Sequence, residues 1–162
     1  MSLDPIGEAE RQWRAHGWTS AASGMVAVTS LTRVQQLLHQ RIDALLRPFD
    51  LTFARYEVLM LLDFSRRGAL PMSTIGSRLQ VHPASVTSAV ERLEGQGFVV
   101  RERDEVDRRK VFARISPAGR RTAKKATEVL NREVFANLGL TSKDLTAINR
   151  LLGELRAREG DL

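Results

Sequence analysis

The sequence contains no cysteine, and histidine occurs only as His16, His39 and His82. Without thiols, a chain has no disulfide framework, no thiolate zinc site and no thiol redox switch. The three histidines are too far apart in the sequence to form a helical metal-binding motif. We therefore expect neither a bound metal nor a cofactor.

Long apolar runs are missing as well. The longest, residues 58–62, is far shorter than the roughly 20 residues that a helix needs to cross a bilayer. The first residues also lack the apolar segment with basic flanks that marks a secretory signal. Hydrophobic residues make up 43% and charged residues 27% of the chain, which is ordinary for a folded domain. These features predict a cytoplasmic protein without a membrane-spanning segment.

Positive charge is concentrated in one part of the chain. The formal net charge is +6, and the whole excess lies between Arg92 and Lys125, where eleven basic residues stand against five acidic ones. Such a block is typical of a surface that binds a polyanion, and an acidic membrane is a poorer alternative partner. The plainer interpretation is a solvated basic surface without any partner.

The spacing of apolar residues predicts a mainly helical chain. A short charged helix over 6–17 precedes the small-residue stretch 19–24, which is typical of a linker. A long helix follows over 25–49, and Thr141 resembles the first residue of a capping box that begins the last helix. The other predicted helices cover residues 53–65, 74–80, 83–94 and 117–137.

The period of the pattern changes after Gly97. Residues 98–103 and 111–115 read as two strands joined by a highly charged turn, which predicts a β-hairpin with a basic tip. Two short helices joined by a three-residue turn and followed by a hairpin form a winged helix-turn-helix. The predicted fold class is therefore mostly α with a small β-hairpin wing.

The terminal helices carry more apolar positions than one winged domain can cover, which favours a homodimer. The predicted organisation has four segments. Residues 1–24 form an N-terminal extension, 25–50 and 117–162 form the dimerisation helices, and 51–116 form the winged helix-turn-helix.

The helix over 83–94 has two distinct faces. Its apolar residues fall within one arc, and small or hydroxyl residues occupy the opposite arc. Small side chains allow close approach to DNA, and hydroxyls can reach base edges or phosphates. The candidate DNA contacts on this helix are Ala84, Ser85, Thr87, Ser88 and Arg92. An amphipathic helix whose outer face is merely hydrated is the alternative.

The hairpin tip adds a sharper signal. Arg108, Arg109 and Lys110 are consecutive cations, which repel one another unless a strongly negative site such as a narrow minor groove receives them. Asp107 lies two residues before Arg109, and we expect its carboxylate to orient that guanidinium. An exposed ion pair of little energetic value is the alternative.

These residues carry a family resemblance. The segments 73–79, 81–87 and 92–99, the wing Asp107-Arg108-Arg109 and the junction 115–120 resemble the MarR (multiple-antibiotic-resistance regulator) family of dimeric transcription factors. The order of elements from 25 to 158 agrees with that family. The resemblance implies that Arg109, beside Arg108, enters the minor groove and that the preceding helix reads the major groove. Ser88 departs from the long polar or basic side chain of many relatives.

The N-terminal extension resembles the subgroup of that family that responds to urate and related small anions. By this resemblance Trp13 is a candidate ligand contact, whereas packing of an extra helix is the plainer explanation of Trp13 and Trp18. His39 and Tyr56 supply polar atoms on apolar helix faces, and we expect them to line a small-molecule cleft beside the long helix.

The sequence therefore predicts a homodimeric, double-stranded-DNA-binding regulator, in the role of a repressor, on a pseudo-palindromic operator. Release by a small anionic or aromatic ligand and ligand-independent or architectural DNA binding both remain open. An enzyme is not expected, because the sequence has no phosphate-binding glycine loop and no histidine-centred relay. A protein-interaction module would leave the basic wing without a role.

Overall fold

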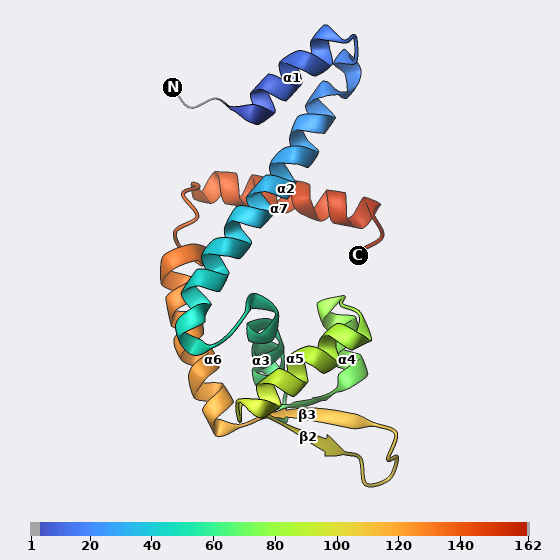
Figure 1. The fold of residues 1–162 in the computed structure, drawn as a ribbon, viewed down its shortest axis with the longest axis vertical. Coiled ribbons are helices and arrows are strands. Elements are labelled where there is room, and N and C mark those ends of the chain that lie inside the picture. Colours follow the sequence, from blue (N-terminus) through green and yellow to red (C-terminus); the bar gives the residue numbers. More distant parts are fainter. Residues whose placement is uncertain (1–3, 162) are drawn as a thin grey trace.

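The computed structural model describes residues 4–161, which form a mostly helical chain with one small sheet (Figure 1). The helices are α1 (Pro5–Ala15), α2 (Thr19–Leu46), α3 (Phe53–Phe64), α4 (Met72–Leu79), α5 (Pro83–Gly95), α6 (Pro117–Leu130) and α7 (Ser142–Arg158). The strands are β1 (Ala69–Pro71), β2 (Val99–Arg103) and β3 (Val111–Ile115). The predicted fold class is confirmed.

The molecule has two parts, which are joined by α6 and by the turn that leads from α2 into α3. Figure 1 shows α2 as a long rod with α1 folded back beside its N-terminal end and α7 crossing it, while α3, α4, α5 and the sheet lie together below. The core of the lower part is built from buried residues on α3, α4 and α5. Buried residues from the C-terminal end of α2 and from α6 belong to the same core. Its largest fully buried side chains are Leu46, Leu59, Leu62, Ile75, Leu93 and Leu130.

The sheet is antiparallel and has the order β1-β3-β2. The predicted hairpin is β2 and β3, in which Val99 faces Ile115 and Arg103 faces Val111. Strand β1 was not predicted. It pairs with β3, where Ala69 faces Arg114. Its three residues are too few to produce a periodic pattern in the sequence.

The linker predicted over 19–24 is wrong, because these residues form the first turns of α2. No proline interrupts them, and alanine and serine are tolerated within a helix. Ala22 is fully buried where α1 folds back on α2. The small side chains thus allow two helices to approach closely.

Short polar side chains cap several of the helices, and Thr141 does so as the sequence predicts. Thr52 caps α3 by accepting a hydrogen bond from the Arg55 amide, and Ser116 caps α6 by accepting one from Gly119. Thr141 caps α7 through the Asp144 amide at 3.2 Å. The long helices end earlier than expected: α2 passes into a 3-10 turn over Arg47–Phe49, and α6 into a π turn over Asn131–Phe135.

Candidate nucleic-acid interface

Helix α5 presents the two faces that the sequence predicts. It begins at Pro83, and His82 caps it, with Nδ1 accepting a hydrogen bond from the Ala84 amide at 3.1 Å. Val86, Val90 and Leu93 are buried, and the candidate contact residues on the opposite side are exposed. The face that was expected to meet DNA is therefore accessible.

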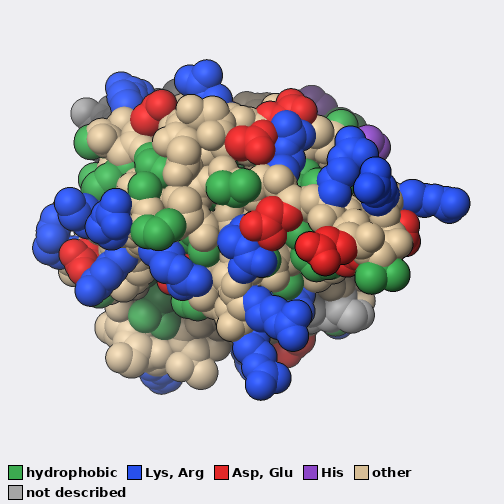
Figure 2. All heavy atoms as spheres, turned by 90° about the horizontal axis from the view of Figure 1, so that it is seen from below, with side chains coloured by type: hydrophobic (Ala, Val, Ile, Leu, Met, Phe, Trp, Pro, Cys, Tyr) green, Lys and Arg blue, Asp and Glu red, His purple; other side chains and the backbone are tan. Residues whose placement is uncertain are grey.

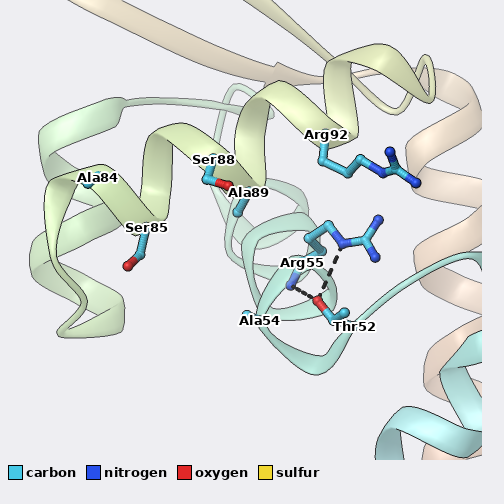
Figure 3. A pocket seen from close by; sticks show the side chains of 8 residues that line it. All are labelled: Thr52, Ala54, Arg55, Ala84, Ser85, Ser88, Ala89 and Arg92. Atoms are coloured by element: carbon cyan, nitrogen blue, oxygen red, sulfur yellow. Dashed lines mark hydrogen bonds between the residues drawn. The ribbon is translucent and has the colours of Figure 1, made fainter.

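The outer residues of α5 border two different grooves. Ser85, Ser88 and Arg92 line a groove of about 580 Å³ between α5 and the start of α3 (Figure 3). Thr87 lies on the other side, toward α4, and its hydroxyl donates to the Pro83 carbonyl at 3.1 Å. Within residues 4–161 the hydroxyls of Ser85 and Ser88 make no hydrogen bond, so they remain available to a partner.

Arg55 is a candidate site residue that the sequence pattern did not indicate. It extends from the first turn of α3 into the same groove as Arg92, and Figure 3 shows both guanidinium groups at one end of that groove. Arg55 is half-buried and has no carboxylate partner in the described part of the chain. The only signal in the sequence is a lone cation at the head of the apolar stretch 53–62.

Two aspartates shape the tip of the wing. Asp104 Oδ1 accepts hydrogen bonds from the amides of Asp107 and Val106, each at 2.8 Å, and these bonds hold the pKa of Asp104 below its usual range. Asp107 Oδ1 accepts from the Arg109 amide at 3.1 Å. The expected contact between Asp107 and the Arg109 guanidinium is therefore wrong, because the carboxylate is used to close the turn.

Only part of the basic block is neutralised within the chain. Arg101 pairs with Glu91 and Glu94, Arg114 with Glu102, and Arg120 with Asp63. The other cations of the block have no carboxylate partner among residues 4–161: Arg92, Arg103, Arg108, Arg109, Lys110, Arg121, Lys124 and Lys125. Figure 2 shows Lys and Arg side chains spread across the end of the molecule that carries the wing, with fewer acids among them.

The three candidate ligand residues do not meet in one chain. Trp13 lies at the far end of α2, where its ring packs edge-on against Trp18 with centroids 5.3 Å apart. Tyr56 is buried, and its hydroxyl shares a hydrogen bond with that of Thr127 at 2.9 Å. His39 is exposed on α2 and lies edge-on to Phe53, with ring centroids 5.9 Å apart.

Two adjoining cavities lie where α3 meets its neighbours. One of about 550 Å³ opens between α3 and α6 and is lined by Tyr56, and another of about 470 Å³ lies between α2, α3 and α7 and is lined by His39. Phe53 and Glu57 border both. Burial raises the pKa of Glu57 above its ordinary value, although the charge of His39 acts in the opposite direction.

Between positions 4 and 161, no three His, Cys, Asp or Glu side chains gather in a way that could hold a metal ion. Over the same range, no helix is both long and apolar enough to span a bilayer.

Comparison with known proteins places this geometry in a family. A model of the MarR family matches residues 51–111, which include α3, α4, α5, β2 and the wing turn. The chain is 41% identical to Sco5413, a MarR family transcriptional regulator from Streptomyces coelicolor; the two structures align over 86% of this chain and 97% of that one, with a TM-score of 0.79. The chain belongs to the MarR family.

Two further transcriptional regulators are similar to this chain. Sco3205 from Streptomyces coelicolor, solved in complex with DNA, is 25% identical and aligns over 83% of this chain and 86% of that one, with a TM-score of 0.72. The HTH-type transcriptional regulator YkoM from Bacillus subtilis is 42% identical over 53 residues, or 33% of this chain. That match spans about a third of YkoM, 34% of its length.

Proposed function

We propose that this MarR-family chain is a homodimeric repressor that binds a pseudo-palindromic operator in double-stranded DNA. The observation that carries the proposal is the union of an exposed small-residue face on α5 with a wing whose Arg108, Arg109 and Lys110 lack acidic partners in the described chain. In this arrangement α5 reads base edges in the major groove, and Arg109 enters the adjacent minor groove.

Exposed apolar side chains on the terminal helices support the dimer. Val28, Val34 and Leu37 on α2, and Leu151 and Leu155 on α7, are each more than two-fifths exposed. An apolar surface spread over two crossing helices is suited to a second copy related by a two-fold axis. Such a dimer presents two copies of α5 to successive major grooves, about 34–36 Å apart.

Selection of bound duplexes from random DNA tests the proposal. We expect an inverted repeat whose half-sites are about 10 base pairs apart, and a ratio of specific to random affinity of at least about a thousand. Enrichment of no sequence, together with equal affinity for all duplexes, would instead favour an architectural DNA-binding protein.

A second proposal is that a small aromatic or carboxylic acid releases the DNA. The cavities lined by His39, Tyr56 and Glu57 support it, because they combine apolar walls with a few polar groups at the junction of α2 and α3. A ligand that prefers one spacing of the two α5 helices would shift the population away from the DNA-binding form.

Titration of the protein–DNA complex with such acids tests this second proposal, with release followed by anisotropy and binding by the fluorescence of Trp13 and Trp18. We expect release by an acid that fits the cavities, and a Glu57→Gln variant with altered affinity for it. If no acid changes either signal, and deletion of residues 1–20 leaves DNA binding unchanged, the ligand-independent alternative holds.

A further inference from the structure

The groove between α3 and α5 supports a DNA contact outside the helix-turn-helix and the wing. We infer that Arg55, together with Arg92, holds a backbone phosphate of the duplex beside α5. This inference rests on the proposed DNA-binding function and adds a positioning contact to it. Arg55 lies on α3, which is neither the reading helix nor the wing.

Hydrogen bonds orient the guanidinium of Arg55 but leave part of it unused. Its Nη1 donates to the Asp50 carbonyl at 2.9 Å and to Gln96 Oε1 at 3.2 Å, and its Nε donates to Thr52 Oγ1 at 3.3 Å. Within residues 4–161, Nη2 has no acceptor. An arginine stays charged in a protein and suits planar, two-pronged contacts with phosphate, so this oriented and incompletely bonded group is suited to an anion.

The Asp50 carboxylate accepts a hydrogen bond from Gln96. Gln96 Nε2 donates to Asp50 Oδ2 at 2.8 Å and to the Asp50 carbonyl at 2.7 Å. The Asp50 carboxylate is thereby held by an amide, and Arg55 receives only neutral oxygens as acceptors. Gln96, at the end of α5, is thus a positioning residue for Arg55, and it fixes the start of α3 to the reading helix.

Arg92 adds a second cation to the groove. It is exposed on α5 one turn beyond Ser88, and it has no acidic partner in the described chain. Figure 3 shows the Arg55 and Arg92 side chains extending the same way, with their charged ends on the same side of the groove. Two neighbouring cations without a counter-ion repel each other, and a phosphate between them relieves that repulsion.

Apart from its two arginines, the groove is lined by small side chains. These are Thr52, Ala54, Ala84, Ser85, Ser88 and Ala89. Among the lining residues drawn in Figure 3, only the two arginines have long side chains. Because Ser85 and Ser88 are the proposed base-edge contacts, the phosphate held beside them belongs to the same duplex, where it fixes the register of α5.

Fluorescence anisotropy with the full chain tests the inference, using the selected operator and a random duplex from about 50 to 300 mM salt. We expect Arg55→Gln to weaken binding to both duplexes about tenfold and to lower the slope of log K against log salt by about 0.9, since one phosphate contact is lost. Arg11→Ala, which removes an exposed cation on α1, is the matched control and should change neither quantity.

The variants separate the possible failures. A parent protein without sequence preference contradicts the proposed function itself. A parent that binds its operator normally, with Arg55→Gln equal to it in affinity and salt slope, contradicts only the phosphate contact. Weaker binding at an unchanged slope would show a purely structural role for Arg55 and would also overturn the inference.

The positioning role of Gln96 has its own measurement. We expect Gln96→Ala to weaken binding less than Arg55→Gln, and the double variant to be no weaker than Arg55→Gln alone, because both act on one contact. Fully additive losses would contradict the coupling between these residues.

Discussion

The carboxylate of Asp107 accepts a hydrogen bond from the backbone amide of Arg109 at 3.1 Å, and the Arg109 guanidinium takes no part in that bond. The acid therefore shapes the turn without neutralising the cation beside it. The Asp104 carboxylate also shapes the turn, because it accepts hydrogen bonds from the backbone amides of Val106 and Asp107, each at 2.8 Å. The wing thus has a fixed backbone and unneutralised arginine side chains, which suits insertion into a negative groove.

Replacement of the wing arginine should weaken binding without regard to sequence. Arg109→Ala removes one charge from an exposed side chain, so we expect an unchanged unfolding temperature and weaker binding to operator and random DNA alike. The salt slope should fall by about one unit. Equal binding by the variant and the parent, measured by anisotropy, would show that the wing does not contact DNA.

Replacement of a hydroxyl on α5 should instead change selectivity. Ser88→Ala removes a side-chain oxygen that is exposed and, within the described residues, unbonded, so the fold should not be affected. We expect a loss of about 1–3 kcal/mol at one operator position and almost none on random DNA. Competition with singly substituted operators locates that position, and a uniform loss across all of them would refute base reading by Ser88.

Sedimentation should give about twice the chain mass of 18.1 kDa at micromolar concentration. Leu151→Glu places a charge on the exposed apolar face of α7, where Leu151 is 53% exposed, and should produce monomers. Val106→Glu is the matched control, because Val106 is 96% exposed at the wing tip. A parent that sediments as a monomer would contradict both the dimer and the palindromic operator.

The stability of the fold should depend on the ionisation of Glu57. Burial raises the pKa of Glu57 in the folded state, so ionisation costs stability as pH rises from the ordinary carboxyl pKa through the raised one. The charge of His39 on α2 opposes this shift, and His39 Nδ1 in turn lies 3.8 Å from Asp43 Oδ2. Glu57→Gln should therefore stabilise the fold near pH 7.5 and have little effect near pH 3.5.

Urea unfolding at the two pH values measures this difference. Glu128→Gln on α6 is the control, because Glu128 is exposed and its replacement should change stability little at either pH. A Glu57→Gln variant that is no more stable than the parent near pH 7.5 would show that the charged carboxylate is well solvated.

Two glycines should respond in opposite ways to alanine. A Cβ at Gly119 would clash with the Phe98 carbonyl and lie 3.0 Å from Ile115 Cγ1, so Gly119→Ala should cost about 1–3 kcal/mol. A Cβ at Gly24, within α2, meets nothing within 4 Å, and Gly24→Ala should stabilise the helix by up to about 1 kcal/mol. Thermal unfolding compares them, and equal effects would contradict the close approach at Gly119.

The reading helix could be predicted from the sequence because its signals are local. Pro83 and the spacing of Val86, Val90 and Leu93 specify where α5 begins and which face it buries, and the structure agrees. The wing strands follow from their β-rich runs and the charged turn in the same way. Each of these features depends on residues close together in the chain.

The missed features depend on distant residues. Arg55 is linked to the end of α5 by its hydrogen bond with Gln96, which lies 41 positions later in the chain. Strand β1 exists because β3 offers it an edge, and residues 19–24 are helical because α1 packs on them. Sequence periodicity does not predict such contacts, because they form only in the tertiary fold.

The continuity of α2 gives the molecule a mechanical property. Its 28 residues form a rod about 42 Å long. A tilt of about 5° at the Leu46 end therefore displaces the Trp18 end by about 4 Å, given that length. Helix α1 therefore lies at one end of the α2 rod, and the other end of that rod packs against the part of the molecule that contains α5. A small change of angle at the Leu46 end of α2 therefore produces a larger displacement of α1, which a spectroscopic label on α1 would detect.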